Sequence, residues 1–202
     1  MNAPHEAALC LVDGKDVPDD AFGPFLSWLS DSEQARLGRF VRRERRRQFL
    51  IGRVLLRRML GRVLGMEASL VPLLERHGQA PQLAMADCEA VGFSLSHSGP
   101  WVACAVSAGT ALGLDIEMRD GARDLAALAA QAFDAHENAW LAARPQADRV
   151  HDFYRLWSAK EAQYKLHAPS AQCISLEHAE LSVSLCSAQP LARVPSLALV
   201  PF

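Results

Sequence analysis

Residues 113–117, Gly-Leu-Asp-Ile-Glu, constrain the fold more than any other short segment of this chain. Side chains along a strand point alternately to its two faces, so a strand here separates Leu114 and Ile116 from Asp115 and Glu117. Carboxylates two residues apart on one strand face start about 7 Å apart at the backbone, near enough to share an ion. Without a cation they repel each other. The pattern predicts a strand with one core face and one face suited to Mg²⁺ or Mn²⁺, which prefer hard oxygen ligands.

A second segment, residues 157–162 (Trp-Ser-Ala-Lys-Glu-Ala), lies in a stretch typical of an amphipathic helix. Between 150 and 166, apolar residues recur at spacings of three, four or seven, which predicts a buried stripe. That stripe comprises Phe153, Leu156, Trp157 and Tyr164. Glu161 and Lys165 are four residues apart and share a different face. Taken alone, they could be a solvated ion pair, and the acidic strand could be the outer face of a half-exposed sheet.

Four short motifs occur in order along the chain. Phe40 and the Gly-Arg pair at 52–53 come first, followed by Phe-Ser-Leu-Ser-His-Ser at 93–98. Segment 113–117 is third, and segment 157–162 follows about forty residues later. This order resembles the 4'-phosphopantetheinyl transferase superfamily, and more closely its two-lobed, surfactin-synthetase-activating (Sfp-like) type. The resemblance extends from about residue 29 to residue 165.

The resemblance implies an α+β fold of two similar lobes with a pseudo-twofold relation, each a small antiparallel sheet packed with a long helix. We expect the lobes to span residues 1–110 and 111–202, with the active site in the cleft between them. A chain of 202 residues can form two such lobes around a substantial core. No internal repeat is visible in the sequence. The second lobe is expected to lack a strand or more, because the chain after Lys165 departs from the family pattern.

The resemblance also implies a reaction, the transfer of the 4'-phosphopantetheine arm of coenzyme A to a serine of an apo acyl or peptidyl carrier protein. The other product is adenosine 3',5'-bisphosphate. Asp115, Glu117 and Glu161 would hold Mg²⁺ (or Mn²⁺) on the pyrophosphate. Glu161 would also take the proton of the carrier serine, directly or through a metal-bound water, and Lys165 would stabilise the departing phosphate. Because the partner supplies the nucleophile, no Ser-His-Asp or Cys-His pattern is needed.

By the same resemblance, the residues expected to contact coenzyme A are Arg36, Gly78, Pro81, Ser96, His97 and Lys160. Arg36 and His97 would bind the 3'-phosphate end, although a histidine at a strand end can also be an ordinary turn residue. The family usually has Gly-Lys/Arg-Pro where this chain has Gly-Gln-Ala-Pro at 78–81. We therefore expect a backbone contact there and no charged one. Lys160 is either a further phosphate contact or a surface residue.

Eleven of the eighteen arginines lie between Arg36 and Arg62, with Glu44 the only acid among them, although the net charge of the chain is −2. Such a local surplus indicates an anionic partner. The run could be a solvated face, a nucleic-acid-binding helix, or a phosphate site combined with a docking surface for an acidic carrier protein. No recognisable nucleic-acid-binding motif or interleaved aromatic residues accompany it, so we expect no specific nucleic-acid partner. Two alternatives to the enzyme stay open: a catalytically weak member that binds coenzyme A or a carrier protein, and a basic nucleic-acid-binding protein.

The five cysteines are odd in number and widely spaced, at positions 10, 88, 104, 173 and 186. With no Cys-x-x-Cys among them, we expect neither a disulfide framework nor a zinc ribbon, and a reducing compartment. Residues 1–13 lack the basic start and apolar run of a signal peptide, and no run reaches membrane-spanning length. The expectation is a cytoplasmic monomer with no membrane partner.

Overall fold

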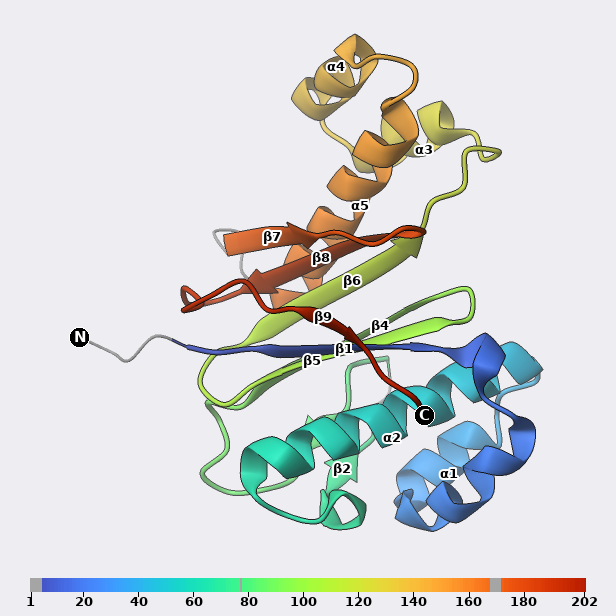
Figure 1. The fold of residues 1–202 in the computed structure, drawn as a ribbon, viewed down its shortest axis with the longest axis vertical. Coiled ribbons are helices and arrows are strands. Elements are labelled where there is room, and N and C mark those ends of the chain that lie inside the picture. Colours follow the sequence, from blue (N-terminus) through green and yellow to red (C-terminus); the bar gives the residue numbers. More distant parts are fainter. Residues whose placement is uncertain (1–4, 77, 168–171) are drawn as a thin grey trace.

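The structure, a computed structural model, describes residues 5–76, 78–167 and 172–202, which form two lobes (Figure 1). Each lobe packs one long helix against a small sheet, which confirms the predicted α+β class. The main elements of the first lobe are β1 (Ala8–Asp13), α1 (Asp31–Leu37), α2 (Arg43–Leu64), β4 (Gly92–Ser98) and β5 (Trp101–Ser107). Those of the second are β6 (Leu112–Met118), α3 (Leu125–Ala132), α4 (Ala135–Ala143), α5 (Arg149–Leu166), β7 (Gln172–Leu176) and β8 (Leu181–Ser187).

The two lobes repeat one order of elements, namely a strand, a long helix and a hairpin. In the first lobe these are β1, α2 and the β4–β5 hairpin, and in the second they are β6, α5 and the β7–β8 hairpin. In both sheets the first strand pairs antiparallel with the second hairpin strand, which gives the orders β1-β5-β4 and β6-β8-β7. This repetition agrees with the pseudo-twofold relation that the resemblance implied.

The first sheet has a fourth strand that the sequence did not place there. β9 (Leu197–Leu199) runs parallel to β1, with Leu197 opposite Leu9 and Leu199 opposite Leu11. A segment from the end of the chain thus completes the sheet of the first lobe (Figure 1). The lobe boundary at residue 110 stays a prediction. Short elements fill the connections of the first lobe: η1 (Gly14–Asp16), η2 (Asp19–Trp28), η3 (Ala68–Leu70), β2 (Leu73–Leu74) and β3 (Gln82–Leu83).

Local sequence signals account for the helices of the first lobe. Ser30 and Glu33 form a capping box at the start of α1, where the Glu33 carboxylate accepts from the Ser30 N–H at 2.8 Å. α2 ends at Gly65, whose φ of 66° is the left-handed conformation that favours glycine. Its apolar side packs on the sheet through a stripe in which Phe49, Leu56, Met59 and Leu60 are buried.

A second core lies between the two sheets and belongs to both lobes. This core is formed by side chains from both sheets, namely Leu9, Leu11, Trp101, Ala103, Ala105, Leu112, Leu114, Ile116, Leu181, Val183 and Leu185. Leu114 and Ile116 are fully buried in it, which confirms the predicted core face of the 113–117 strand. Within the described residues, no helix is both long and apolar enough to cross a membrane.

Three details differ from expectation. Tyr164, predicted in the buried stripe of α5, is 73% exposed, because that part of the helix packs through Ala162 and Leu166 instead. Residues 19–28, for which the sequence suggested no helix, form the 3₁₀ segment η2. β7 was not predicted at all.

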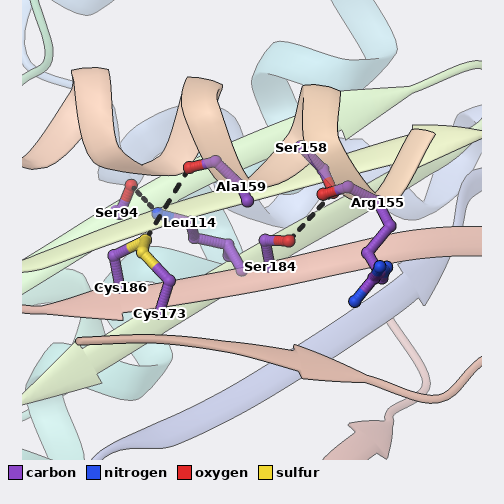
Figure 2. The surroundings of a disulfide bond; sticks show 8 residues. All are labelled: Ser94, Leu114, Arg155, Ser158, Ala159, Cys173, Ser184 and Cys186. Atoms are coloured by element: carbon purple, nitrogen blue, oxygen red, sulfur yellow. Dashed lines mark hydrogen bonds between the residues drawn. A yellow bond between two sulfur atoms is a disulfide. The ribbon is translucent and has the colours of Figure 1, made fainter. Parts of the chain in front are cut away.

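A disulfide joins two of the cysteines, which corrects the expectation that none would form. Cys173 of β7 and Cys186 of β8 lie directly opposite each other in the hairpin and are bonded (Figure 2). The buried Cys186 also packs under α5 with Ala162 and Leu166. The other cysteines are free thiols.

Candidate active site

Alternate serines of β4 join the two sheets along a seam. The hydroxyls of Ser94, Ser96 and Ser98 accept hydrogen bonds from the backbone N–H groups of Leu114, Ile116 and Met118 of β6, at 2.9, 3.2 and 3.0 Å. Figure 2 includes the first of these bonds. Side-chain hydroxyls here take the place of backbone carbonyls in a ladder between edge strands. The seam therefore fixes the register of β6 relative to the Ser-His motif of β4.

The same serines hold the two carboxylates of β6. Ser96 Oγ donates to Asp115 Oδ1 at 2.9 Å, and Ser98 Oγ donates to Glu117 Oε2 at 2.9 Å. Asp115 is only 4% exposed and Glu117 is partly buried, so the acidic face of this strand is not an ordinary solvated face. The sequence predicted that the two carboxylates share a face of the strand, and the structure shows that this face contacts the serines of β4.

Lys165 of α5 reaches the same point. Its Nζ donates to Asp115 Oδ1 at 2.8 Å, to Ser96 Oγ at 3.1 Å and to the Leu114 carbonyl at 3.0 Å. α5 comes this close because Gly113 has no side chain, since a Cβ there would overlap the carbonyl oxygen of Ala162. The glycine that opens the 113–117 motif thus brings the two motifs together.

The electrostatics of the carboxylates reflect their burial and mutual repulsion. Burial raises the pKa of Asp115 above its ordinary value against the opposing effect of Lys165, and the charge of Glu161 raises it further. Burial, followed by repulsion from Asp115, raises the pKa of Glu117. Glu161 is half-buried on α5, one turn before Lys165. The three predicted metal ligands therefore interact across the seam.

One oxygen of this cluster has no partner. Asp115 Oδ2 is buried and accepts no hydrogen bond from any residue that the structure describes. Oδ1 is shared by Lys165 and Ser96, so Oδ2 is the atom available to a cation. The chemistry of these ligands suits a hard divalent ion, because Asp115, Glu117 and Glu161 all offer carboxylate oxygens. The site is not pre-assembled, since within the described ranges no three His, Cys, Asp or Glu side chains are gathered closely enough to hold a metal.

His97 lies near the end of β4, between the two serines that hold Asp115 and Glu117, with its ring exposed. Its neighbour is Arg45 of α2, whose Nη1 lies 3.0 Å from Nε2 and 3.2 Å from Nδ1 of the ring. The surrounding protein atoms and then the Arg45 charge lower the pKa of His97, although the ring retains contact with solvent. The sequence singled out His97 but gave no reason to choose Arg45 from a run of arginines.

Arg36, the other predicted phosphate contact, belongs to an ion-pair network under α1. It pairs with Glu75, which also accepts from Arg53 Nε at 2.9 Å. Arg53 lies 3.1 Å from Glu33, a fully buried carboxylate that Arg57 contacts at 2.9 Å. Several arginines of the run thus neutralise buried acids. Arg36 itself is 42% exposed at its side chain, so it retains a face toward solvent.

The remaining predicted contacts lie farther along the chain. Gly78 and Pro81 lie between β2 and β3 in the chain, and Gly78 has a φ of 68°. No charged side chain lies between Gly78 and Pro81, but Arg76 is close to this segment, and its Nε donates to the Ala80 carbonyl at 3.1 Å. Lys160 is ion-paired with Glu137 of α4 at 2.8 Å. A phosphate contact by Lys160 would require that pair to open.

A cavity of about 600 Å³ opens beside the start of α2. Its walls include Gln48 and Pro100, which border the β4–β5 turn, and Lys15 and Arg47 on the other side. Asp115, Glu117 and Glu161 do not line it. The carboxylates therefore belong to the seam and not to this cavity.

Comparison with known proteins identifies the family of this chain. A family model described as "4'-phosphopantetheinyl transferase, N-terminal" matches residues 18–109, and one described as "4'-phosphopantetheinyl transferase superfamily" matches residues 111–194. The 4'-phosphopantetheinyl transferase HetI of Nostoc sp. is 32% identical over 186 residues, which cover 92% of this chain and 78% of HetI. The chain belongs to the 4'-phosphopantetheinyl transferase superfamily.

Two further relatives carry the same activity in their names. The 4'-phosphopantetheinyl transferase AcpT of Salmonella typhimurium is 33% identical over 153 residues, covering 73% of this chain and 74% of AcpT. The 4'-phosphopantetheinyl transferase Sfp of Bacillus subtilis is 29% identical over 141 residues, covering 70% of this chain and 61% of Sfp. This member of the superfamily is thus an enzyme of the transferase class, as the sequence motifs predicted.

Proposed function

We propose that this phosphopantetheinyl transferase moves the 4'-phosphopantetheine arm of coenzyme A to a serine of an apo acyl or peptidyl carrier protein, with adenosine 3',5'-bisphosphate as the other product. The observation that carries the proposal is the state of Asp115. One carboxylate oxygen is held by Ser96 and Lys165 and the other is buried without a partner. A buried, half-satisfied carboxylate is costly unless a ligand completes it.

Asp115, Glu117 and Glu161 would hold the divalent cation, Mg²⁺ or Mn²⁺. When bound, such an ion supplies charge neutralisation on the pyrophosphate oxygens. Asp115 would offer Oδ2, because Oδ1 is committed to Lys165 and Ser96. Glu117 is held by Ser98 through one oxygen, and its other oxygen, which bonds to none of the described residues, would serve the same purpose. The serine seam therefore orients both carboxylates before any ligand arrives.

Proton transfer and leaving-group stabilisation fall to α5. Glu161 would accept the proton of the carrier serine as that oxygen attacks the phosphorus of the pantetheine phosphate. Lys165 would place its ammonium beside the phosphate that departs with the adenosine. Because the seam takes three hydrogen bonds from this ammonium, Lys165 would act on the phosphate through its charge or by exchanging one of those bonds for a phosphate oxygen.

Coenzyme A would lie over the first lobe. Ser96 and His97 would contact its phosphates from the end of β4, Arg36 would add charge, and Gly78 and Pro81 would offer backbone contacts to the adenine. Lys160 would be a further phosphate contact once released from Glu137. The carrier protein would approach the exposed face of α5.

The remaining proposals concern location and partners. We propose a cytoplasmic monomer without a membrane or specific nucleic-acid partner. The arginine run supports the last point, because Arg53 and Arg57 are buried and Arg36, Arg43 and Arg47 pair with carboxylates. The disulfide between Cys173 and Cys186 is the feature that argues against a reducing compartment.

The test is to incubate the protein with coenzyme A, Mg²⁺ and an apo carrier protein, and to weigh the carrier by mass spectrometry. A carrier serine that gains the mass of phosphopantetheine supports the proposal. An unchanged carrier, with several carrier classes tried and with the protein shown to be folded, would favour a member that binds without turnover.

A further inference from the structure

Three buried serine hydroxyls form a cluster where α5 packs on β8. Ser158 Oγ lies 3.0 Å from Ser182 Oγ and 2.9 Å from Ser184 Oγ. Figure 2 shows the contact between Ser158 and Ser184. The following turns of the helix pack through the apolar Ala162 and Leu166. Hydroxyls gain less from burial than apolar groups do, so burial alone does not explain this serine cluster.

The serine cluster adjoins the carboxylates of β6. Ser184 lies opposite Asp115 in the antiparallel pairing of β6 with β8. Ser182 lies opposite Glu117, two positions along. Side chains of directly opposite residues share a face of the sheet, with Cβ atoms about 4.5–5.5 Å apart. Each carboxylate therefore has a serine of β4 on one side and a serine of β8 on the other.

The serine cluster is also close to Glu161 on α5. Glu161 follows Ser158 by three residues, which makes the two side chains neighbours on the helix surface. The next residue, Ala162, lies against Gly113 of β6 so closely that no Cβ would fit there. α5 is thus held on the sheet at Ser158 and at Ala162. The ion pairs among the described residues include none with Glu161, so the placement of its carboxylate depends on the helix.

We propose that the serine cluster positions Glu161 for the proposed transfer, by fixing α5 where Glu161 can share a cation with Asp115 and Glu117. The inference rests on the proposed function, because it concerns the same cation. Within the described residues, the three carboxylates are not gathered closely enough to hold a metal, so a small displacement of α5 decides whether Glu161 joins the other two. Hydrogen bonds resist such a displacement because they weaken steeply with distance and angle, whereas apolar contacts are non-directional.

The first experiment measures metal binding without turnover. Mn²⁺ is titrated into the protein with saturating coenzyme A and no carrier protein, and free Mn²⁺ is followed by electron paramagnetic resonance. We expect Ser158→Ala to weaken Mn²⁺ binding by about tenfold, as the loss of a group that orients metal ligands does. Ser184→Ala removes part of the same contact from β8 and should weaken binding by about threefold or more.

Ser107→Ala is the matched control, because Ser107 is also a buried serine with two hydrogen bonds. Its Oγ donates to the Glu6 carbonyl at 2.6 Å and accepts from the Gly109 N–H at 3.3 Å, both within the first lobe. This variant should lose stability, yet its Mn²⁺ affinity should stay within about twofold of the wild type, because the site is distant. A loss of stability alone does not change the affinity of the molecules that remain folded.

Steady-state transfer at saturating Mg²⁺ gives a second measurement. In Ser158→Ala the kcat should fall by about tenfold or more, because a misplaced Glu161 is a poorer base. The KM for coenzyme A should change by less than about twofold, because the contacts proposed for the first lobe are intact. Ser107→Ala should change neither quantity by more than about twofold.

Mn²⁺ affinities of Ser158→Ala and Ser184→Ala within about twofold of the wild type would overturn the inference, because the serine cluster would then only stabilise the fold. The inference also fails if neither variant folds, if Ser107→Ala loses as much affinity as Ser158→Ala, or if the wild type with coenzyme A binds no Mn²⁺. Failure of the carrier-modification assay would overturn the proposed function alone, since the binding comparison needs no carrier protein.

Discussion

The hydroxyl of Ser96 in one sheet donates a 2.9 Å hydrogen bond to the carboxylate of Asp115 in the other. The same hydroxyl accepts from the N–H of Ile116 at 3.2 Å and from Lys165 at 3.1 Å. One oxygen atom thus contacts both lobes and the helix that carries Glu161. The position of the candidate site depends on this junction, and several consequences can be measured.

Replacing Ser96 by alanine should destabilise the fold. It leaves the buried N–H of Ile116 and one oxygen of Asp115 without their hydroxyl partner, which costs about 1–3 kcal/mol. Urea denaturation measures the loss. Ser175→Ala on β7 is the control, an exposed strand serine with no described side-chain bond, and it should lie within about 0.5 kcal/mol of the wild type. Equal stability of the two variants would show that the seam does not depend on this hydroxyl.

Replacing Asp115 by alanine should abolish transfer at every Mg²⁺ concentration. The variant loses both the oxygen available to a cation and the partner of Lys165. Leu114 and Ile116 keep their place in the core, so far-ultraviolet circular dichroism should remain that of the folded protein. Carrier mass against Mg²⁺ concentration is the measurement, with Glu67→Gln, an exposed acid, as the control. Near-wild-type activity in Asp115→Ala, or full activity of the wild type in EDTA, would end the metal-site proposal.

The pH dependence of bisphosphate binding should report on His97. In the free protein its surroundings and Arg45 lower the pKa of this imidazole below the ordinary value near 6.5, so it is neutral at pH 7. A bound phosphate dianion stabilises the protonated ring and raises that pKa, and binding then takes up a proton. Affinity should therefore rise as the pH falls from about 8 toward about 6, through the ordinary histidine range.

The control for that profile is His97→Gln, because the phosphate also titrates near this range, at about pH 6. The ratio of wild-type to variant affinity removes the contribution of the ligand. A ratio that does not change with pH would show that His97 does not touch the phosphate.

Reduction of the disulfide should destabilise the second lobe. A bond between residues 13 positions apart restricts the unfolded chain, and the chain-entropy estimate for such a loop is about 3 kcal/mol. Thermal melting with and without reductant measures the change, and Cys173→Ser should be insensitive to reductant. Thiol titration of the unfolded, unreduced chain should find Cys10, Cys88 and Cys104 only. Five reactive thiols would show that the bond does not form.

Much of the fold followed from local patterns in the sequence. The alternation at 113–117 predicted which side chains enter the core, and the buried Leu114 and Ile116 confirm it. The capping box at Ser30 and the stop at Gly65 depend on residues within a few positions of each other, so they can be recognised without knowing the rest of the fold.

The features that the sequence did not predict have a common physical cause: each depends on packing against a segment that is distant in the chain. Tyr164 continues the spacing of the α5 stripe, but the first half of α5 packs under α3 and α4 while the second half packs on β6 and β8. The buried side of the helix therefore rotates along its length. The pairing of Cys173 with Cys186 depends on hairpin register, and that of Arg45 with His97 on the docking of α2 against β4. Neither contact can be predicted from the spacing of residues in the sequence.

The parallel strand β9 has a consequence for how this chain folds. Leu9 and Leu197 pair across almost the full length of the described chain, so the loop that must close before they meet is very long. Contacts of that separation slow folding, and until they form β1 presents an open edge to other chains. The first lobe would thus be the last to be completed, and a fragment that ends near residue 110 would expose the edge of β1 that β9 otherwise covers. Dividing this protein between its lobes for expression should therefore favour aggregation of the first half.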